Sequence, residues 1–184
     1  MQRFVLLFSF ALMLVACNPM KEVPPQLFIT NTDTNLQKTD NGWFYKGQAF
    51  NGYMVERGRD GKILYRLPIV DGREEGAAPA IYETGEKLLL RHFKNGLKEG
   101  KFEQWWPNGH YRYLFNYSAD AWDGKQLVFY PNGNKRQESN FKNGALDGIQ
   151  RTWSPGGELT SNYTVKNGKV YGLITVISCL PHGH

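Results

Sequence analysis

The side chains best suited to bind a metal lie near the end of the chain. Cys179, His182 and His184 form a C-x2-H-x-H pattern. A thiolate and two imidazoles are ligands that zinc and copper both accept, so this tail is a candidate site for either metal. Only three ligands are present, and a tail that binds no metal is the alternative. No other cofactor is expected.

Cys17 is the second side chain with a predicted chemistry. It follows Arg3 and an apolar run from Phe4 to Val15, which is too short to span a bilayer and typical of a secretory signal. The residues LVAC at 14–17 resemble the bacterial lipobox, which implies cleavage before Cys17 and attachment of lipid, including palmitate, to that residue. An ordinary signal peptide or an uncleaved anchor is the alternative.

A lipid on Cys17 would hold the protein at a membrane surface without a spanning helix. Asn18 follows, and in Gram-negative bacteria an Asp there would favour the inner membrane. We therefore expect a lipid-anchored protein of the cell envelope, at the outer membrane and facing the periplasm; in a Gram-positive host it would lie on the outer face of the cell membrane. Residues 1–16 are the predicted signal peptide. Residues 17–40, rich in Pro, Asn and Thr, are the predicted lipidated Cys and flexible tether, in which residues 27–29 could form a first strand.

Aromatic side chains crowd the segment WWPNGHYRYLF at 105–115. Exposed aromatic side chains are frequent hot spots of protein contacts. Tyr111, Tyr113 and Phe115 alternate with other residues, which predicts that they share one face of a strand. Trp122 departs from the pattern of its neighbours, and either makes a contact or packs beneath an altered turn. The candidate binding residues are Trp105, Tyr111, Tyr113, Phe115 and Trp122.

The elements that position these residues follow from a repeat of 24 residues. Glycines keep this period in three series, the longest being Gly52, Gly76, Gly100, Gly124, Gly148 and Gly172. A Pro-Asn-Gly turn occurs at 107–109 and again at 131–133, and each of these residue types favours tight turns. Each unit is therefore predicted to be two strands joined by a hairpin turn, with a second turn before the next unit.

We predict an all-β fold, an elongated single-layer antiparallel β-meander built from about five 24-residue hairpin repeats over residues 41–172. Aromatic residues on both faces of a strand, such as the adjacent Trp105 and Trp106, favour a single layer, and a β-sandwich is the alternative. Residues 173–184 would add a closing strand and a C-terminal tail.

A row of acidic residues precedes the framework glycines, at Glu75, Glu99, Asp123 and Asp147. An acidic array could bind a metal or act in acid catalysis, but carboxylates also accept backbone hydrogen bonds at turns. We predict the second role, with each carboxylate serving its own turn. The sequence has no phosphate-binding loop, no H-E-x-x-H motif and no recognisable Ser-His-Asp set, so we do not expect an enzyme.

The pattern YPNG at 130–133, followed by FKNGALDG at 141–148, resembles the MORN-repeat variant. The resemblance covers residues 42–172. This variant occurs in bacterial proteins described as antitoxin-type or membrane-associated. The resemblance implies a scaffold for protein or membrane contact, and it supplies no catalytic motif.

Together these features predict a membrane-anchored bacterial lipoprotein that acts as a non-enzymatic scaffold and binds a protein or a surface. An antitoxin or immunity-type protein that sequesters a toxin is one alternative, and metal binding through the C-terminal tail is another. The net charge of +5 is spread along the chain without a dense basic cluster, so nucleic acid is not an expected partner. The expected partners are the membrane, through the lipid, and an unknown protein, and the oligomeric state stays open.

Overall fold

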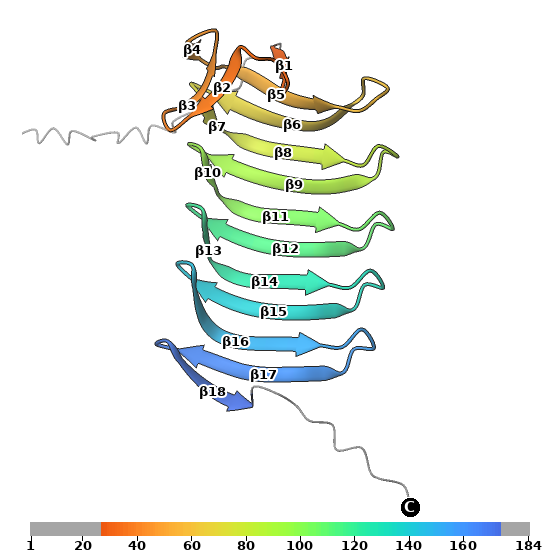
Figure 1. The fold of residues 1–184 in the computed structure, drawn as a ribbon. Coiled ribbons are helices and arrows are strands. Elements are labelled where there is room, and N and C mark those ends of the chain that lie inside the picture. Colours follow the sequence, from red (N-terminus) through yellow and green to blue (C-terminus); the bar gives the residue numbers. More distant parts are fainter. Residues whose placement is uncertain (1–26, 174–184) are drawn as a thin grey trace, which may run out of the picture.

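A computed structural model describes residues 27–173, and every regular element in that range is a β-strand. One long sheet has 15 strands, and a small sheet of 3 strands lies beside its first strands (Figure 1). The strands are β1 (Phe28–Thr30), β2 (Leu36–Thr39), β3 (Gly42–Tyr45), β4 (Gln48–Ala49), β5 (Gly52–Arg57), β6 (Ile63–Val70), β7 (Arg73–Glu74), β8 (Gly76–Ile81), β9 (Lys87–Lys94), β10 (Leu97–Lys98), β11 (Gly100–Trp105), β12 (Tyr111–Ser118), β13 (Ala121–Trp122), β14 (Gly124–Phe129), β15 (Lys135–Lys142), β16 (Ala145–Trp153), β17 (Leu159–Lys166) and β18 (Lys169–Leu173).

The long sheet is a meander in which strands that follow one another in the chain are also neighbours in space. Its order is β1-β5-β6-β8-β9-β11-β12-β14-β15-β16-β17-β18, and the short strands β7, β10 and β13 pair with β6, β9 and β12. The pairs are antiparallel except for β1 with β5, where Phe28 lies beside Tyr53 in parallel strands. The predicted all-β antiparallel meander is therefore confirmed, and its hairpins are stacked one after another (Figure 1).

One turn of each unit is a hairpin turn, which Pro-Asn-Gly forms between β11 and β12. Trp106 N donates to His110 O at 2.8 Å, and Gly109 has a φ of +83°, a conformation that glycine adopts without steric cost. The strand register shifts between Gln104 and Trp105, and an equivalent shift occurs in the other hairpins of the sheet. Such a bulge changes the face that the residues beyond it occupy.

The second turn of each unit has two successive residues with positive φ. Asn95 and Gly96 have φ values of +51° and +85°, as a type I′ turn requires. In one unit Ala119 and Asp120 hold the same backbone, with φ values of +47° and +67°. The turn therefore keeps the same backbone conformation where the sequence departs from Asn-Gly.

Neighbouring hairpins in the middle of the sheet pair with one another over a short stretch. β9 and β11 share two residue pairs, and β12 and β14 also share two. Beyond these pairs the strands diverge towards the second turn, and side chains fill the gap. In the gap between β12 and β14, Gln126 Oε1 accepts from Asn116 N and Gln126 Nε2 donates to Asn116 O, both at 2.9 Å. The side-chain amide thus replaces a backbone partner.

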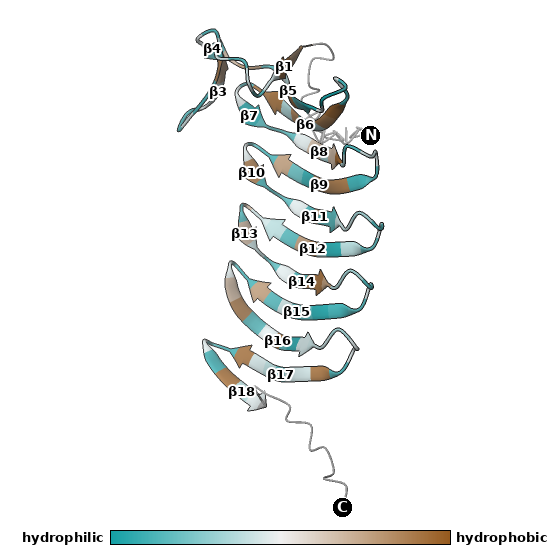
Figure 2. Ribbon diagram, turned by 45° about the vertical axis from the view of Figure 1, so that its right-hand side comes forward, coloured by the Kyte–Doolittle hydropathy of each residue, from teal (hydrophilic) through white to brown (hydrophobic). Residues whose placement is uncertain are grey.

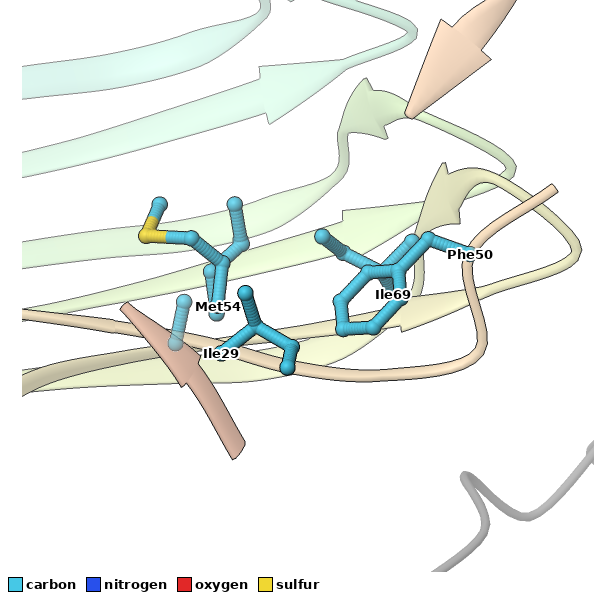
Figure 3. Close-up of a cluster of buried hydrophobic side chains, with 6 residues drawn as sticks. Ile29, Phe50, Met54 and Ile69 are labelled. Atoms are coloured by element: carbon cyan, nitrogen blue, oxygen red, sulfur yellow. The ribbon is translucent and has the colours of Figure 1, made fainter. Parts of the chain in front are cut away.

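The buried hydrophobic core lies at the N-terminal end of the sheet. Its members are Ile29, Phe50, Met54, Leu67, Ile69 and Ala78 (Figure 3). Trp43 and Tyr45 of the small sheet pack against this core, so a second layer exists over the first hairpins. Farther along the sheet, much of each strand is hydrophilic or of intermediate hydropathy, with separate hydrophobic segments (Figure 2).

The ordered fold begins before residue 41. β1 and β2 lie within residues 17–40, which the sequence analysis assigned to the tether, because the apolar stretch around Phe28 pairs with β5 and β2 pairs with β3. The predicted closing strand and tail, residues 173–184, lie outside the described residues apart from Leu173, with which β18 ends. The predicted signal peptide and Cys17 also lie outside them.

Candidate functional site

Three residues of the acidic row join their unit to the next one. Glu75 Oε2 accepts a hydrogen bond from Asn95 N at 2.8 Å, and Glu99 Oε2 accepts one from Ala119 N at 2.9 Å. Asp123 makes the equivalent bond at 3.3 Å. The prediction that each carboxylate serves its own turn is therefore wrong for these three residues. A two-residue turn leaves the amide of its first residue without a ladder partner, and the carboxylate of the preceding unit takes that amide.

In three successive hairpins, the aromatic residue that begins the hairpin turn also bonds to the next unit. The Tyr82 hydroxyl donates to Trp105 O at 2.9 Å. Trp106 Nε1 donates to Phe129 O at 3.3 Å, and the Tyr130 hydroxyl makes the equivalent bond at 3.0 Å. The unit-to-unit bonds at both edges explain why these side chains recur with the repeat, and they give the sheet a defined surface.

The candidate binding residues lie on both faces of that sheet. Tyr113 lies opposite Gln104 and Tyr111 lies opposite Trp105, with a register shift between the two pairs. The Tyr111 hydroxyl donates to Glu103 Oε1 at 3.4 Å, and its ring centroid lies 5.5 Å from that of Trp105. Because Glu103 and Gln104 are neighbours in one strand, they face opposite ways. The prediction that Tyr111 and Tyr113 share a face is therefore wrong, since it assumed unbroken alternation.

Tyr113, Phe115 and Trp122 belong to one connected group of rings. The ring centroids of Tyr113 and Phe115 are 5.0 Å apart, and those of Phe115 and Trp122 are 5.8 Å apart. Phe102 joins Phe115 at 5.8 Å, and Phe141 joins Trp122 at 4.8 Å. We call these five residues the Trp122 cluster.

Phe102 and Phe141 are the two members that the sequence analysis did not select. Phe102 lies opposite Phe115 in the hairpin of β11 and β12. Phe141 lies opposite Gly124 in the next hairpin. The spacing of the hairpin turn could have revealed the first pairing, and the second depends on how neighbouring hairpins stack.

Trp122 is the most exposed member of the cluster, at 40% of its surface. It meets Phe141 edge-on with an interplanar angle of 70°, an arrangement that aromatic pairs favour. Three and two units earlier, Phe50 and Glu74 occupy the equivalent positions, and both are buried. Equivalent positions of successive units thus form a row along the sheet, and Trp122 belongs to it. The small sheet covers this row at the N-terminal end of the molecule.

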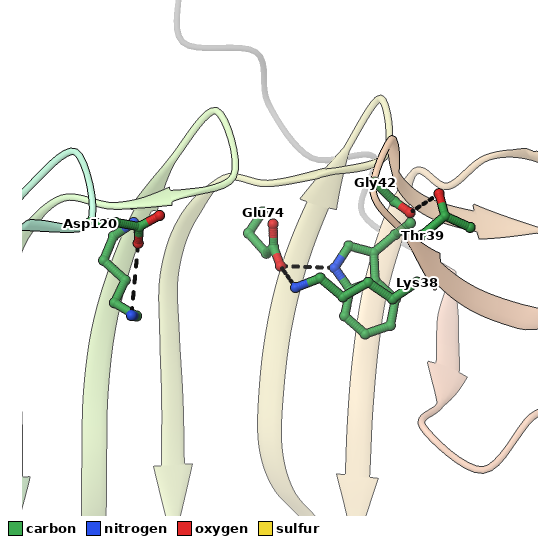
Figure 4. A network of polar contacts seen from close by, with 7 residues as sticks. Lys38, Thr39, Gly42, Glu74 and Asp120 are labelled. Atoms are coloured by element: carbon green, nitrogen blue, oxygen red, sulfur yellow. Dashed lines mark hydrogen bonds and ion pairs between the residues drawn. The ribbon is translucent and has the colours of Figure 1, made fainter.

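Glu74 shows how the covered part of this row is held. Glu74 Oε1 accepts hydrogen bonds from Lys38 Nζ at 2.8 Å and from Trp43 Nε1 at 2.9 Å (Figure 4). Burial alone would raise the pKa of Glu74, but the two hydrogen bonds and the charge of Lys38 outweigh burial and lower that pKa. The small sheet is thus attached through an ionised carboxylate.

The opposite face carries rings and cations in alternation. Lys87 Nζ lies 5.5 Å from the Trp105 ring centroid, and the Tyr111 and Phe129 centroids lie 6.3 Å apart. A cavity of about 240 Å³ beside Tyr111 has Leu114 in its wall. A lysine thus lies over Trp105, whereas the cation–ring contacts of the described residues include none over Trp122, although Arg91 lies over Phe102 and Arg112 over Tyr113 of its cluster.

Glu138 is a buried carboxylate held by two lysines. It lies 3.2 Å from Lys125 Nζ and 3.4 Å from Lys135 Nζ. Burial alone would raise the pKa of Glu138, but the hydrogen bonds and charges of these lysines, Lys125 first, lower it. The carboxylate is therefore ionised and compensated within the sheet.

Within residues 27–173, no group of three or more His, Cys, Asp or Glu side chains could hold a metal ion. Cys179, His182 and His184 lie outside the described residues, so the metal site stays a prediction, as does the lipid site at Cys17. The described part of the chain contains no helix long and apolar enough to cross a membrane.

Two segments of the chain match a known family. Residues 98–119 and 122–143 match the MORN repeat variant. These segments are successive units, and together they contain all five residues of the Trp122 cluster. The sequence between them is the altered turn at Asp120. A comparison with curated proteins gives no match.

Proposed function

We propose that the protein is a non-enzymatic scaffold that binds a partner protein through the Trp122 cluster. The observation that carries this proposal is the exposed Trp122, which meets the half-buried Phe141 edge-on, on a row that the small sheet covers elsewhere. Tryptophan and other large aromatic side chains supply much of the binding energy at protein interfaces.

The construction of the sheet supports this role. Hydrogen bonds such as Trp106 Nε1 to Phe129 O and Asn95 N to Glu75 Oε2 fix each unit against the next. A surface that is already ordered loses less conformational entropy on binding. MORN repeats commonly mediate protein or membrane contacts, and the two matched units carry the cluster.

The proposal places the protein in the bacterial cell envelope, as a lipoprotein of the outer membrane that faces the periplasm. The lipid would be attached at Cys17, and residues 18–26 would join it to the sheet. Labelling cells with a clickable palmitate analogue should mark the wild-type protein and leave Cys17→Ala unmarked. A Cys17→Ala protein that still carries the label would contradict lipid attachment at this residue.

Site-specific photo-crosslinking in the native host tests the binding face. A photoreactive amino acid at position 122 should give one discrete protein adduct, and Phe141→Ala should reduce its yield. Position 111 is the matched control, because Tyr111 is 39% exposed and Trp122 40%, on opposite faces of the sheet. Equal adducts from both positions, or none from either, would contradict the proposal. Adducts that contain lipid and no protein would replace it with contact to a membrane surface.

A further inference from the structure

A second cavity lies where β9 and β11 diverge. Its volume is about 320 Å³, and its walls include Arg91, His92, Lys98, Lys101, Phe102 and Tyr117. Four of these side chains are basic and two are aromatic, and no carboxylate lines the cavity. A cavity with this lining favours an anion attached to an apolar body.

Aromatic rings hold two of the cations in place. The Arg91 guanidinium lies 5.3 Å from the Phe102 ring centroid, and Lys98 Nζ lies 5.4 Å from the Tyr117 centroid. Such contacts orient a cation without neutralising its charge.

The charges of the cavity are little compensated. Lys98 Nζ lies 3.8 Å from Asp120 Oδ1, and because both side chains are about half exposed, this pair is weak. No ion pair joins Arg91 or Lys101 to a carboxylate of the described residues. The cavity therefore keeps a positive charge.

Two of these cations, Arg91 and Lys98, are not part of the repeat, whereas Lys101 has a lysine, Lys125, at the equivalent position of the next unit. The residues equivalent to Arg91 in other units are Leu67, Phe115, Ser139 and Tyr163. The residues equivalent to Lys98 are Phe50, Glu74, Trp122, Leu146 and Val170. A side chain that recurs in every unit serves the fold, whereas these two basic residues occur together in one unit only.

The gap at this cavity lacks the side-chain amide that closes the next two gaps. Phe102 stands at the position of Gln126, which closes the next gap with two hydrogen bonds to the backbone. His92 Nδ1 lies 3.0 Å from Lys101 O. A carbonyl oxygen only accepts, so Nδ1 donates there, and Nε2 is left for another contact.

We propose that this cavity binds a small soluble organic phosphate whose apolar body lies against Phe102 and Tyr117. A phosphate monoester carries about two negative charges at neutral pH. Arg91 supplies an uncompensated cation and Lys98 a second one that Asp120 compensates only weakly, and the planar guanidinium can hold two phosphate oxygens at once. The volume of 320 Å³ is in the range of cavities that take small molecules.

Titration of the full chain in an uncharged detergent, with phenyl phosphate as the probe, tests this proposal by NMR. The amide signals of Lys98, Gly100 and Lys101 should shift and saturate, with a Kd below about 1 mM. Inorganic phosphate should bind at least about tenfold more weakly, because it lacks the apolar body. Arg91→Gln should weaken binding about tenfold or more. Lys98→Gln should also weaken binding, and because Lys98 is exposed and holds its ring contact to Tyr117 at the surface, this change should leave the fold intact.

Arg136→Gln is the matched control. It removes the same charge from a cation that lies 5.8 Å from the Tyr130 ring centroid, outside the cavity, and should leave the affinity unchanged. An equal loss in Arg136→Gln, shifts that do not saturate, or equal affinity for inorganic phosphate would overturn the proposal. Binding to phosphatidic acid vesicles that phenyl phosphate does not compete would also overturn it. Phe102 lines the cavity and also belongs to the Trp122 cluster, but Trp122 itself does not line the cavity. Trp122→Ala should therefore leave phenyl phosphate binding intact while it removes the partner contact, so failure of one proposal can be told from failure of the other.

Discussion

The first and the later hairpins follow the same 24-residue plan, but they bury different kinds of side chain. One position of the repeat, that of Gln126, lies in the gap between neighbouring hairpins, and we call it the gap position. Met54 and Ala78 occupy it in the first hairpins, where the small sheet adds a second layer. Gln126 and Gln150 fill the equivalent position in the later ones, and they are 4% and 2% exposed. The later hairpins thus bury amides at a place where the first bury hydrocarbon.

The difference shows two ways to stabilise one backbone. Beneath a second layer, apolar side chains leave water entirely, and the hydrophobic effect dominates. In a single layer most side chains stay partly exposed, so the buried positions between hairpins are filled by groups that satisfy backbone donors and acceptors. Repeat proteins are held by such contacts between neighbouring units.

The largest expected effect is the loss of a ring from the covered end. Phe50 is 1% exposed, so Phe50→Ala removes a fully buried side chain and should lower the free energy of unfolding by about 3–5 kcal/mol. Phe141 in the single layer is half-buried, and Phe141→Ala should cost less than about 2 kcal/mol. Urea denaturation of the two variants measures both values. Equal losses would show that the small sheet does not create a separate core.

Exchanging the gap residues tests the comparison directly. Gln126→Met places the side chain of the first hairpins in a later one, and leaves Asn116 N and O without their partner amide. We expect a loss of about 1–3 kcal/mol, the cost of unsatisfied buried groups. Met54→Gln, the reverse exchange, should also destabilise the protein by about 1–3 kcal/mol, because it buries an amide among hydrocarbon.

The same denaturation measurements show whether the gap position requires a polar side chain or only one of the right volume. If Gln126→Met is neutral or stabilising, the gap requires only a side chain of the right volume, and its polarity is incidental. If Met54→Gln is neutral, the first hairpins also offer backbone partners to an amide.

Acid should weaken both regions through their buried carboxylates. The pKa values of Glu74 and Glu138 are lowered from the ordinary value of 4.5, so each ionised group stabilises the folded state above that pH. This contribution is lost as the pH falls below 4.5 and through the lowered pKa of the folded state. Glu74→Gln and Glu138→Gln should each flatten the dependence of unfolding free energy on pH below 5. An unchanged acid limb in both variants would contradict this assignment.

Salt should separate the two carboxylates. Both partners of Glu138 are lysines whose side chains are 53% and 49% exposed, so added salt should screen them. Glu74 also accepts from the neutral indole of Trp43, which salt does not screen. In 0.5 M sodium chloride, the acid sensitivity of the unfolding free energy that is due to Glu138 should therefore decrease more than the part that is due to Glu74.

The 24-residue glycine rhythm was enough to predict the meander. Gly109 and Gly96 mark the two turns, because glycine adopts positive φ readily, and the order of the strands follows from the turns. The small sheet was not predicted, since β2, β3 and β4 lie where the repeat begins and carry no complete unit.

The candidate site could be predicted only in part. Trp122, Tyr113 and Phe115 were predicted as binding residues but not as one group, and the structure brings their rings together. The register shift between Gln104 and Trp105 moves Tyr111 to the other face. A bulge adds one residue without any distinctive residue type, so simple alternation misses it. Contacts between units, such as Asn95 N to Glu75, are equally hidden, because they depend on how hairpins stack.

The smallest expected effect concerns the altered turn between the two matched units. Ala119 has a φ of +47°, a conformation that costs about 1–2 kcal/mol for a residue with a β-carbon. Asparagine tolerates this conformation, and it occupies the equivalent position in the neighbouring units, as Asn95 and Asn143. Ala119→Asn should therefore raise the free energy of unfolding by about 0.5–1 kcal/mol. The hydrogen bond from the residue 119 amide to Glu99 involves only the backbone, so it should persist. The reverse change, Asn143→Ala, should cost a similar amount in thermal or urea denaturation. If Ala119→Asn gains nothing while Asn143→Ala is costly, the neighbouring Trp122 already offsets the strain at this turn, and the altered turn belongs to the binding face and not only to the repeat.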